Sequence, residues 1–329
     1  MSSLFELVKD ERKVCIINDL FPPYPEDFEI VRGGISEVQT QLHRELSENG
    51  IETFVISLSI HGRSPSRPGV YRVGTYVPYS KSSFRRVMYP FLEFFNPAIF
   101  LKVVRILKRE DPSCVEYGAM LQGSLAPLVA ALILRKKVLI RNDWLCPNLY
   151  AKEEACSDRE RFRGCAGCLG INNVFLKPMV GLYSVLMLKL KRFLWNRSHG
   201  IIVQSEHHKK ILSGWGINPD KMIMAPPTST IKEDPDYDEY LKKIKNNRFV
   251  VAYVGRLTEE KGFDLLLEAF ELLKERHPDL LLLVAGTGHL RREAEGVLYL
   301  GWVEKERLGS VYKAADIVAV PTTVPEIHP

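Results

Sequence analysis

Two cations, Arg256 and Lys261, follow the apolar run 249–254. A guanidinium and an ammonium held together suit a diphosphate, and open α/β sheets bind ligands at the carboxyl ends of their strands. The next apolar run ends in Gly286-Thr287-Gly288, whose glycines would let a ligand approach the backbone closely. The sequence therefore predicts a phosphate-binding crevice, with two solvated cations on a surface loop as the simpler alternative.

A glycine pair, Gly33-Gly34, lies between the first apolar run, 14–17, and a helical pattern. Ser36 followed by Gln39 three residues later predicts a capping box at the start of that helix. The free amides and the dipole of a helix N-terminus favour an anion, so this loop also suits a phosphate. Taken alone, the pair is more typical of a flexible turn before an ordinary cap.

Four cysteines lie close together as C-x9-C-x8-C-x2-C, at Cys146, Cys156, Cys165 and Cys168. Four thiolates complete a tetrahedral structural zinc site, and an iron–sulfur cluster needs the same ligands. We expect one of these two metals, with free or disulfide-bonded cysteines as the alternative. Protein ligands would fill every position of such a site, leaving none open for catalysis.

The elements that would hold these residues are short apolar runs separated by helical patterns. The runs lack strict alternation, as expected for parallel strands covered on both faces. Strands separated by helices predict an α/β fold built from βαβ units. The runs are 14–17, 53–58, 138–140, 201–203, 249–254, 280–284 and 317–320.

A change of composition marks an expected linker at residues 226–247, which are rich in proline and mixed charges. We place a first domain at 1–225, with the cysteine-rich insertion 146–168, and a second domain at 248–329. The second domain has room for only about four strands, fewer βα units than a doubly wound nucleotide-binding half contains. It is therefore expected to be incomplete, and the chain truncated at its C-terminal side.

The composition is that of a globular protein, with 46% hydrophobic residues and a net charge of +5 over 329 residues. This charge is too small to indicate nucleic-acid binding. The sequence has no signal-peptide pattern and no run of about 18 apolar residues, so a cytoplasmic protein is expected. Residues 83–109 and 174–195 combine apolar and basic residues, which suits contact with an anionic membrane or a core helix with a basic rim.

Two smaller expectations concern pairs of residues. Cys15 and Cys114 lie in apolar runs and are expected to be buried as small hydrophobic residues. His207 and His208 are expected to form a surface pair at a helix start, because neighbours on a helix do not face one ligand position.

The order of these motifs resembles the large family of retaining glycosyltransferases with two facing Rossmann-like domains, known as the GT-B fold. The resemblance covers nearly the whole chain and is most specific in the second domain. Besides Gly33-Gly34, the matching stretches are Ile201-Ile202-Val203-Gln204-Ser205, Val254-Gly255-Arg256-Leu257, Glu260-Lys261-Gly262, Ala285-Gly286-Thr287-Gly288, Leu300-Gly301-Trp302-Val303 and Ala314-Ala315-Asp316-Ile317 before Pro321. The resemblance implies two α/β domains whose parallel sheets face each other across a cleft. It also implies a nucleotide diphosphate sugar as donor and a glycan or lipid-linked acceptor.

The resemblance assigns roles to individual residues. Arg256 and Lys261 would hold the donor diphosphate, the backbone at Gly34 would close on it, and Gly33 would belong to the same nucleotide-sugar site. Glu326 would lie near the donor sugar, as the first of two glutamates in the family pattern. The remaining positions are Gly255, Gly286 and Gly288 on the nucleotide side, the backbone near Val303 at the base, and Asn142 and Asp143 on the acceptor side.

Two features depart from the family pattern. The second glutamate of the pair would fall beyond Pro329, where the sequence ends. The family often has a histidine before the aspartate, whereas this chain has Asn142-Asp143. Asparagine can hydrogen-bond an acceptor hydroxyl but cannot act as a base near neutral pH.

The sequence thus predicts a retaining glycosyltransferase with Arg256, Lys261 and Glu326 as catalytic residues. No Asp-x-Asp motif stands at a donor site, so the two cations are expected to replace a catalytic metal. The alternatives are an inactive truncated remnant or an acceptor-binding module without transferase activity. A nicotinamide oxidoreductase is disfavoured, because neither strand 14–17 nor strand 249–254 leads into Gly-x-Gly-x-x-Gly at a helix start.

Overall fold

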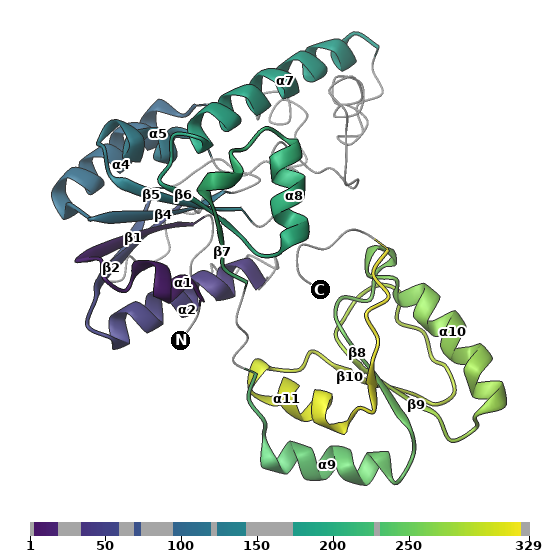
Figure 1. Cartoon of the computed structure of the whole chain (residues 1–329). Coiled ribbons are helices and arrows are strands. Elements are labelled where there is room, and N and C mark those ends of the chain that lie inside the picture. The colour runs from purple at the N-terminus through teal and green to yellow at the C-terminus, as the bar shows by residue number, and fades with distance from the viewer. Residues whose placement is uncertain are drawn as a thin grey trace. The chain divides into compact units, whose positions relative to one another are not determined.

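The structure is a computed structural model, and it describes residues 3–18, 34–58, 69–73, 95–119, 124–142, 174–226 and 231–323. The chain divides into two compact units, the first ending at Thr228 and the second beginning at Ser229 (Figure 1). Each unit is an α/β structure built on its own parallel sheet, which confirms the predicted fold class.

The sheet of unit 1 runs in the order β3-β2-β1-β4-β5-β6-β7, and every described pairing is parallel. Because β1 lies between β2 and β4, the strand order reverses at β1, and such a switch point is where open α/β sheets bind ligands. The strands are β1 Lys13–Asn18, β2 Glu52–Ser57, β3 Val70–Arg72, β4 Cys114–Ala119, β5 Lys137–Asn142, β6 Gly200–Val203 and β7 Met222–Met224.

Alternate residues of each strand in unit 1 pack against different helices. Cys15 and Ile17 face the layer formed by α4, α5, α7 and α8, whereas Val14 and Ile16 face α1 and α2 (Figure 1). Burial on both faces explains why the strands read as continuous apolar runs. The helices are α1 Ser3–Val8, α2 Gly34–Glu48, α4 Pro97–Glu110, α5 Ala126–Ile133, α7 Leu176–Trp195 and α8 Glu206–Gly214, with a 3₁₀ turn at Pro219–Lys221.

Unit 2 has a parallel sheet in the order β10-β9-β8-β11, covered by α9 and α11 on one face and by α10 on the other. The strand order reverses at β8, which lies between β9 and β11. The elements are α9 Pro235–Lys245, β8 Val250–Val254, η2 Glu259–Lys261, α10 Phe263–Arg276, β9 Leu281–Ala285, β10 Val297–Gly301, α11 Lys305–Ala314 and β11 Ile317–Val318.

Residues 235–245, expected within the linker, instead form α9 in the core of unit 2. Leu241 is completely buried among the sheet residues, and Asp234 caps the helix by accepting the backbone N–H groups of Asp236 and Tyr237. The charges that made this segment look like a linker lie on its solvent side, where Lys313 binds Asp238 at 2.7 Å. The boundary between the units therefore lies nearer residue 228 than residue 248.

The two cysteines of the sheet are buried, as predicted. Cys15 and Cys114 are both free thiols with no exposed surface. Burial raises the pKa of Cys114 to about 12, so its thiol stays protonated and inert at neutral pH. In the described part of the chain, no helix is both long enough and apolar enough to cross a membrane.

Candidate functional site

The carboxyl end of β5 brings Asn142 against α8. Asn142 is the last residue of β5, and its side-chain nitrogen lies 3.2 Å from Nε2 of His208. Ser205 caps α8 by accepting the backbone N–H of His208 at 3.2 Å, and Nδ1 of His208 lies 3.3 Å from the backbone nitrogen of Gln204. Both Asn142 and His208 are buried.

The expected surface pair of histidines is half wrong. His207 is exposed, but His208 is completely buried. His208 is the third residue of α8, and residues four apart on a helix lie on the same face. Leu212 is buried, so His208 also faces the sheet. Asn142, which the sequence predicts on the acceptor side, therefore has a histidine partner that sequence reasoning missed.

A buried ion pair lies between the central strands of unit 1. Nε of Arg141 on β5 lies 3.2 Å from Oε1 of Glu116 on β4, and both side chains are almost completely buried. Gln39 of α2, also buried, donates an amide N–H to the same carboxylate at 3.1 Å. Because buried charges need partners, these contacts fix α2 against the sheet. This pair was not predicted from the sequence, because Arg141 follows the apolar run 138–140 and Glu116 lies on a strand that is absent from the predicted runs.

The predicted capping box at the start of α2 is wrong. The helix begins at Gly34, and the side chain of Gln39 is turned to Glu116 rather than back to the helix start. Its Oε1 is buried without a hydrogen-bond partner in the structure. A buried carboxylate attracts an amide donor more strongly than an N-terminal backbone group does, because hydrogen bonds to charged groups are the stronger ones.

Arg256 and Lys261 lie on the loop between β8 and α10, at the switch point of unit 2. The carboxyl ends of the neighbouring strands β8 and β11 open at the same edge of the sheet. Thr323, which follows β11, donates its backbone N–H and its hydroxyl to the carbonyl of Glu260 at 3.2 and 3.3 Å. The segment after β11 thus holds the turn that carries Lys261.

The guanidinium of Arg256 is free to rearrange, whereas its backbone is held. Its side chain is 63% exposed and lies 3.9 Å from Glu260, a loose surface pair that an anionic ligand can displace. The hydroxyl of Tyr253 donates to the Arg256 carbonyl at 2.6 Å. Burial raises the pKa of Tyr253 to about 12, so this donor keeps its proton at neutral pH.

The glycines of the second loop in unit 2 are required by backbone packing. A Cβ at Gly286 would lie 1.8 Å from the carbonyl oxygen of Gly255, and one at Gly288 would lie 2.3 Å from that of Leu257. The backbone N–H of Leu257 donates to the Thr287 carbonyl at 3.0 Å. The loop of Gly286 and Gly288 therefore packs against the loop that carries Arg256 and stabilises its backbone. The predicted contact of both glycines with a nucleotide stays a prediction.

Two other motif residues have structural contacts. Val303 packs its side chain into the core of unit 2, and the predicted contact of its backbone with a base stays a prediction. Asp316 accepts the backbone N–H of Val250 at 2.8 Å and binds Lys245 at 2.7 Å. The hydrogen bond from Lys245 is the main cause of the lowered pKa of Asp316. The charged Asp316 thus links Lys245 of α9 to Val250 of β8.

Several predicted site residues lie outside the ranges that the structure describes. They are Gly33, Asp143, Glu326 and the four cysteines Cys146, Cys156, Cys165 and Cys168. Among the residues that are described, no group of three or more His, Cys, Asp or Glu side chains is arranged to hold a metal ion.

Known proteins resemble both halves of the chain. The profile of the family described as Glycosyltransferase Family 4 matches residues 32–228, more than half of the chain, and that of Glycosyl transferases group 1 matches residues 238–327. An uncharacterised glycosyltransferase of Methanocaldococcus jannaschii is 26% identical over 133 residues, which are 39% of this chain and 33% of that protein. The GPI3 subunit of the phosphatidylinositol N-acetylglucosaminyltransferase of Saccharomyces cerevisiae is 25% identical over 213 residues, 59% of this chain and 45% of that protein.

The chain thus matches less than half the length of these two relatives. Among solved structures, the Anabaena protein HepE in complex with UDP has a TM-score of 0.56 at 15% identity, covering 95% of this chain and 75% of that one. At this identity the likeness shows a common fold alone. The two family profiles establish the family, and the chain belongs to the group 1 glycosyltransferases.

Proposed function

We propose that this protein transfers a sugar from a nucleotide diphosphate sugar to an acceptor hydroxyl. The observation that supports this most is the loop of Arg256 and Lys261, which lies at the switch point of unit 2 and is held by Thr323. In the reaction, the bond between the anomeric carbon and the diphosphate oxygen breaks, and the diphosphate leaves with the bonding electrons. The acceptor oxygen forms the new bond to that carbon, and the proton of its hydroxyl passes to the departing diphosphate.

The main contribution of the protein to this step is electrostatic. Arg256 and Lys261 bind the oxygens on which negative charge develops, and fixed charges of this kind stabilise a transition state strongly. In the proposal, these cations do the work of a catalytic metal, Glu326 lies near the sugar and the anomeric configuration is retained. The backbone at Gly34 closes on the diphosphate, and Asn142 and Asp143 meet the acceptor.

The donor assignment has a direct test. UDP-sugars are tried first, because the HepE structure with the same fold holds UDP. We expect transfer to continue in excess chelator and the product to keep the anomeric configuration of the donor, as read by NMR. Activity that vanishes with chelator and returns with Mg²⁺ contradicts metal independence, provided that the folded fraction is unchanged. Donor binding without any turnover would favour the alternative of an acceptor-binding module.

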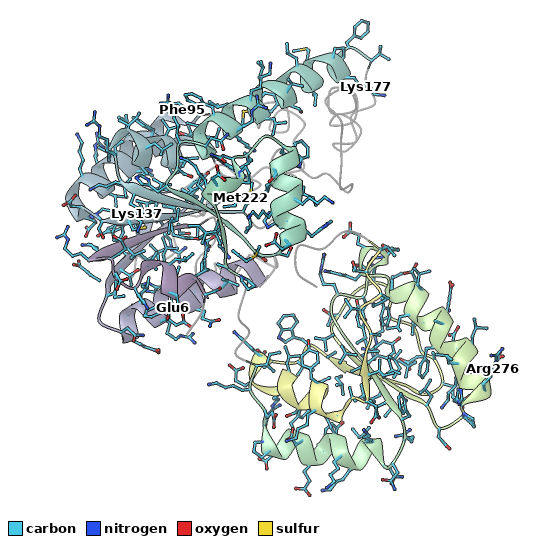
Figure 2. All side chains as sticks on the ribbon, viewed as in Figure 1. Glu6, Phe95, Lys137, Lys177, Met222 and Arg276 are labelled. Atoms are coloured by element: carbon cyan, nitrogen blue, oxygen red, sulfur yellow. The ribbon has the colours of Figure 1, made fainter. Side chains whose placement is uncertain are left out.

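We further propose a glycan or lipid-linked acceptor and contact of α7 with an anionic membrane. The apolar side chains exposed on and before this helix recur at helical spacing, namely Phe175, Met179, Leu182, Leu186 and Phe193. The helix contains no acidic residue and exposes Lys177, Lys189 and Arg192; Figure 2 shows Lys177 near its N-terminal end. Apolar and basic side chains on the exposed face of one helix suit the interface of an anionic bilayer.

Vesicle binding tests the role of α7. We expect the chain to sediment with vesicles of phosphatidylcholine and phosphatidylglycerol and to stay in solution with phosphatidylcholine alone. Replacing Leu182 and Leu186 with serine should abolish this binding. Leu272→Ser serves as the control, because Leu272 is 67% exposed on α10, in the other unit. Equal binding by all these proteins contradicts the proposal.

The cysteine-rich segment has its own proposal, a structural zinc ion or iron–sulfur cluster held by four thiolates. Its support is the spacing in the sequence. Elemental analysis and the visible absorption spectrum of the purified chain distinguish the two metals. We expect about one site per chain, lost in Cys165→Ser and kept in Cys15→Ala. A wild-type protein without zinc or iron contradicts the proposal.

A further inference from the structure

His208 is placed to control the side chain of Asn142 at the end of β5. The two residues are 66 positions apart in the sequence, and His208 has no exposed surface. Its ring lies between two nitrogens, the backbone nitrogen of Gln204 at 3.3 Å from Nδ1 and the side-chain nitrogen of Asn142 at 3.2 Å from Nε2. A neutral imidazole carries one proton, so its two nitrogens must play different roles at these two contacts.

The backbone contact decides which nitrogen carries the proton. The N–H of Gln204 can only donate, and the strand-to-helix connection fixes its direction, so Nδ1 of His208 must be the acceptor. The arrangement resembles a capping box, since Ser205 accepts the N–H of His208 while the His208 side chain reaches back toward the helix start. The proton of the neutral ring therefore lies on Nε2.

With the proton on Nε2, the atom of Asn142 that faces it must be an acceptor. A nitrogen at that place would set two donors against each other in a buried site, which costs the hydrogen bond and leaves a polar group unpaired. The oxygen and nitrogen of an amide are assigned from such networks, and a half-turn of the amide exchanges them. The oxygen of Asn142 then accepts from His208, and its two N–H bonds point away from the ring.

We propose that His208 is a positioning residue that fixes Asn142 as a hydrogen-bond donor on the acceptor side of the reaction. This inference rests on the proposed transferase function for its effect on catalysis, but its geometry does not. In this arrangement Asn142 donates a hydrogen bond to an oxygen atom of the substrate that accepts the sugar. It does not remove a proton from that substrate. The proton of the substrate hydroxyl is therefore taken up by another group. In Asn142→Asp, an oxygen that can only accept hydrogen bonds would face the substrate in place of the amide donor.

The geometry is tested without any activity. The chain contains 8 histidines, so ring-¹⁵N-labelled histidine gives few signals, and the signal lost in both His208→Asn and His208→Gln belongs to His208. Long-range ¹H–¹⁵N correlation then shows which ring nitrogen carries the proton. We expect a proton on Nε2 alone near neutral pH. A proton on Nδ1, or on both nitrogens, overturns the inference.

A pair of variants separates positioning from folding. The oxygen of His208→Asn can replace Nδ1 and keep the contact to Gln204, but this shorter side chain loses the contact to Asn142. The amide nitrogen of His208→Gln lies near the place of Nε2 and can still donate to Asn142. We expect His208→Asn to raise the acceptor KM about tenfold or more, a loss near 1.4 kcal/mol, with an unchanged donor KM.

The matched control is His207→Asn, which changes the exposed neighbour on the same helix and should leave both KM values unchanged. His208→Gln should retain most of the acceptor affinity. If His208→Asn and His208→Gln have the same acceptor KM as the wild type, His208 does not position Asn142. A wild-type chain that shows the Nε2 proton but transfers no sugar contradicts the proposed function and leaves the geometry of His208 standing.

Discussion

The two units hold their candidate site residues by different means. In unit 1 the groups are buried and bind one another through side chains, as Glu116 does with Arg141 and Asn142 with His208. In unit 2 the guanidinium of Arg256 is 63% exposed, whereas the backbone of this residue is held by the hydroxyl of Tyr253. A buried polar pair has one orientation, whereas an exposed cation on a rigid loop can adjust to its ligand; in the proposed function the ligands are an aligned acceptor and a flexible diphosphate, respectively.

The largest expected effect comes from breaking the backbone packing of unit 2. In Gly286→Ala the new Cβ would lie 1.8 Å from the carbonyl oxygen of Gly255, and neither backbone segment can yield without losing its hydrogen bonds. We expect the free energy of unfolding of unit 2 to fall by more than about 4 kcal/mol. Hydrogen exchange measured by mass spectrometry should show the loss in peptides after residue 229 and not in unit 1.

Gly301→Ala is the control for this variant. Gly301 has a φ of 69°, but a Cβ there would meet no atom within 4 Å. Only the left-handed backbone should matter, at about 1 kcal/mol. If Gly286→Ala and Gly301→Ala lower the free energy of unfolding equally, then backbone conformation, rather than close packing, is the reason that glycine is required at position 286.

The next largest effect should come from breaking the buried pair of unit 1. Glu116→Gln removes the charge that faces Arg141 and keeps the shape of the side chain. Leaving a buried charge without its partner costs about 3–5 kcal/mol, and we expect denaturant unfolding of unit 1 to show this loss. The exposed pair of Glu239 with Lys243 supplies the comparison, since Glu239→Gln should change stability by less than about 0.5 kcal/mol. A loss for Glu116→Gln as small as that for Glu239→Gln contradicts the structural role of the buried pair.

A smaller effect with a defined pH dependence is expected at Glu110. The hydroxyl of Tyr71 at 2.6 Å, followed by Lys13 at 3.0 Å, lowers the pKa of Glu110 to about 2. Because the ordinary pKa is 4.5, this contact stabilises the fold above pH 4.5, and the contribution is lost as the pH falls toward 2. Tyr71→Phe should therefore cost about 1–2 kcal/mol at pH 7 and less at pH 3.

Unfolding by urea at several pH values measures this difference. Tyr240→Phe, at a half-exposed tyrosine of unit 2, should show no such trend. A cost for Tyr71→Phe that is the same at pH 7 and at pH 3 would mean that the hydroxyl does not act through the charge of Glu110.

The fold could be predicted wherever its elements leave a local pattern. Strands buried on both faces read as apolar runs, and the parallel α/β class follows from their alternation with helices. The edge strands Val70–Arg72 and Met222–Met224 were missed because three residues carry too short a pattern. The helix Pro235–Lys245 was mistaken for linker because Leu241 is its only completely buried side chain in a highly charged segment.

The candidate site could be predicted in part for the same reason. Arg256 and Lys261 lie five residues apart on one loop, so their spacing after a strand pattern was enough to suggest an anion site. The contact of His208 with Asn142 joins residues far apart in the sequence. No local pattern records such a contact, which depends on the packing of a helix against a strand.

The binding of UDP to the wild-type chain and to Arg256→Ala, measured by isothermal titration calorimetry, tests the central claim most directly. Arg276 supplies the matched control, since it lies at the far end of α10 from the loop (Figure 2). We predict that Arg256→Ala weakens binding about tenfold or more, as expected for a lost charged hydrogen bond, and that Arg276→Ala changes nothing. Equal affinity of the wild type and Arg256→Ala, or no binding of UDP, GDP or ADP to the wild type, would contradict a diphosphate site at this loop.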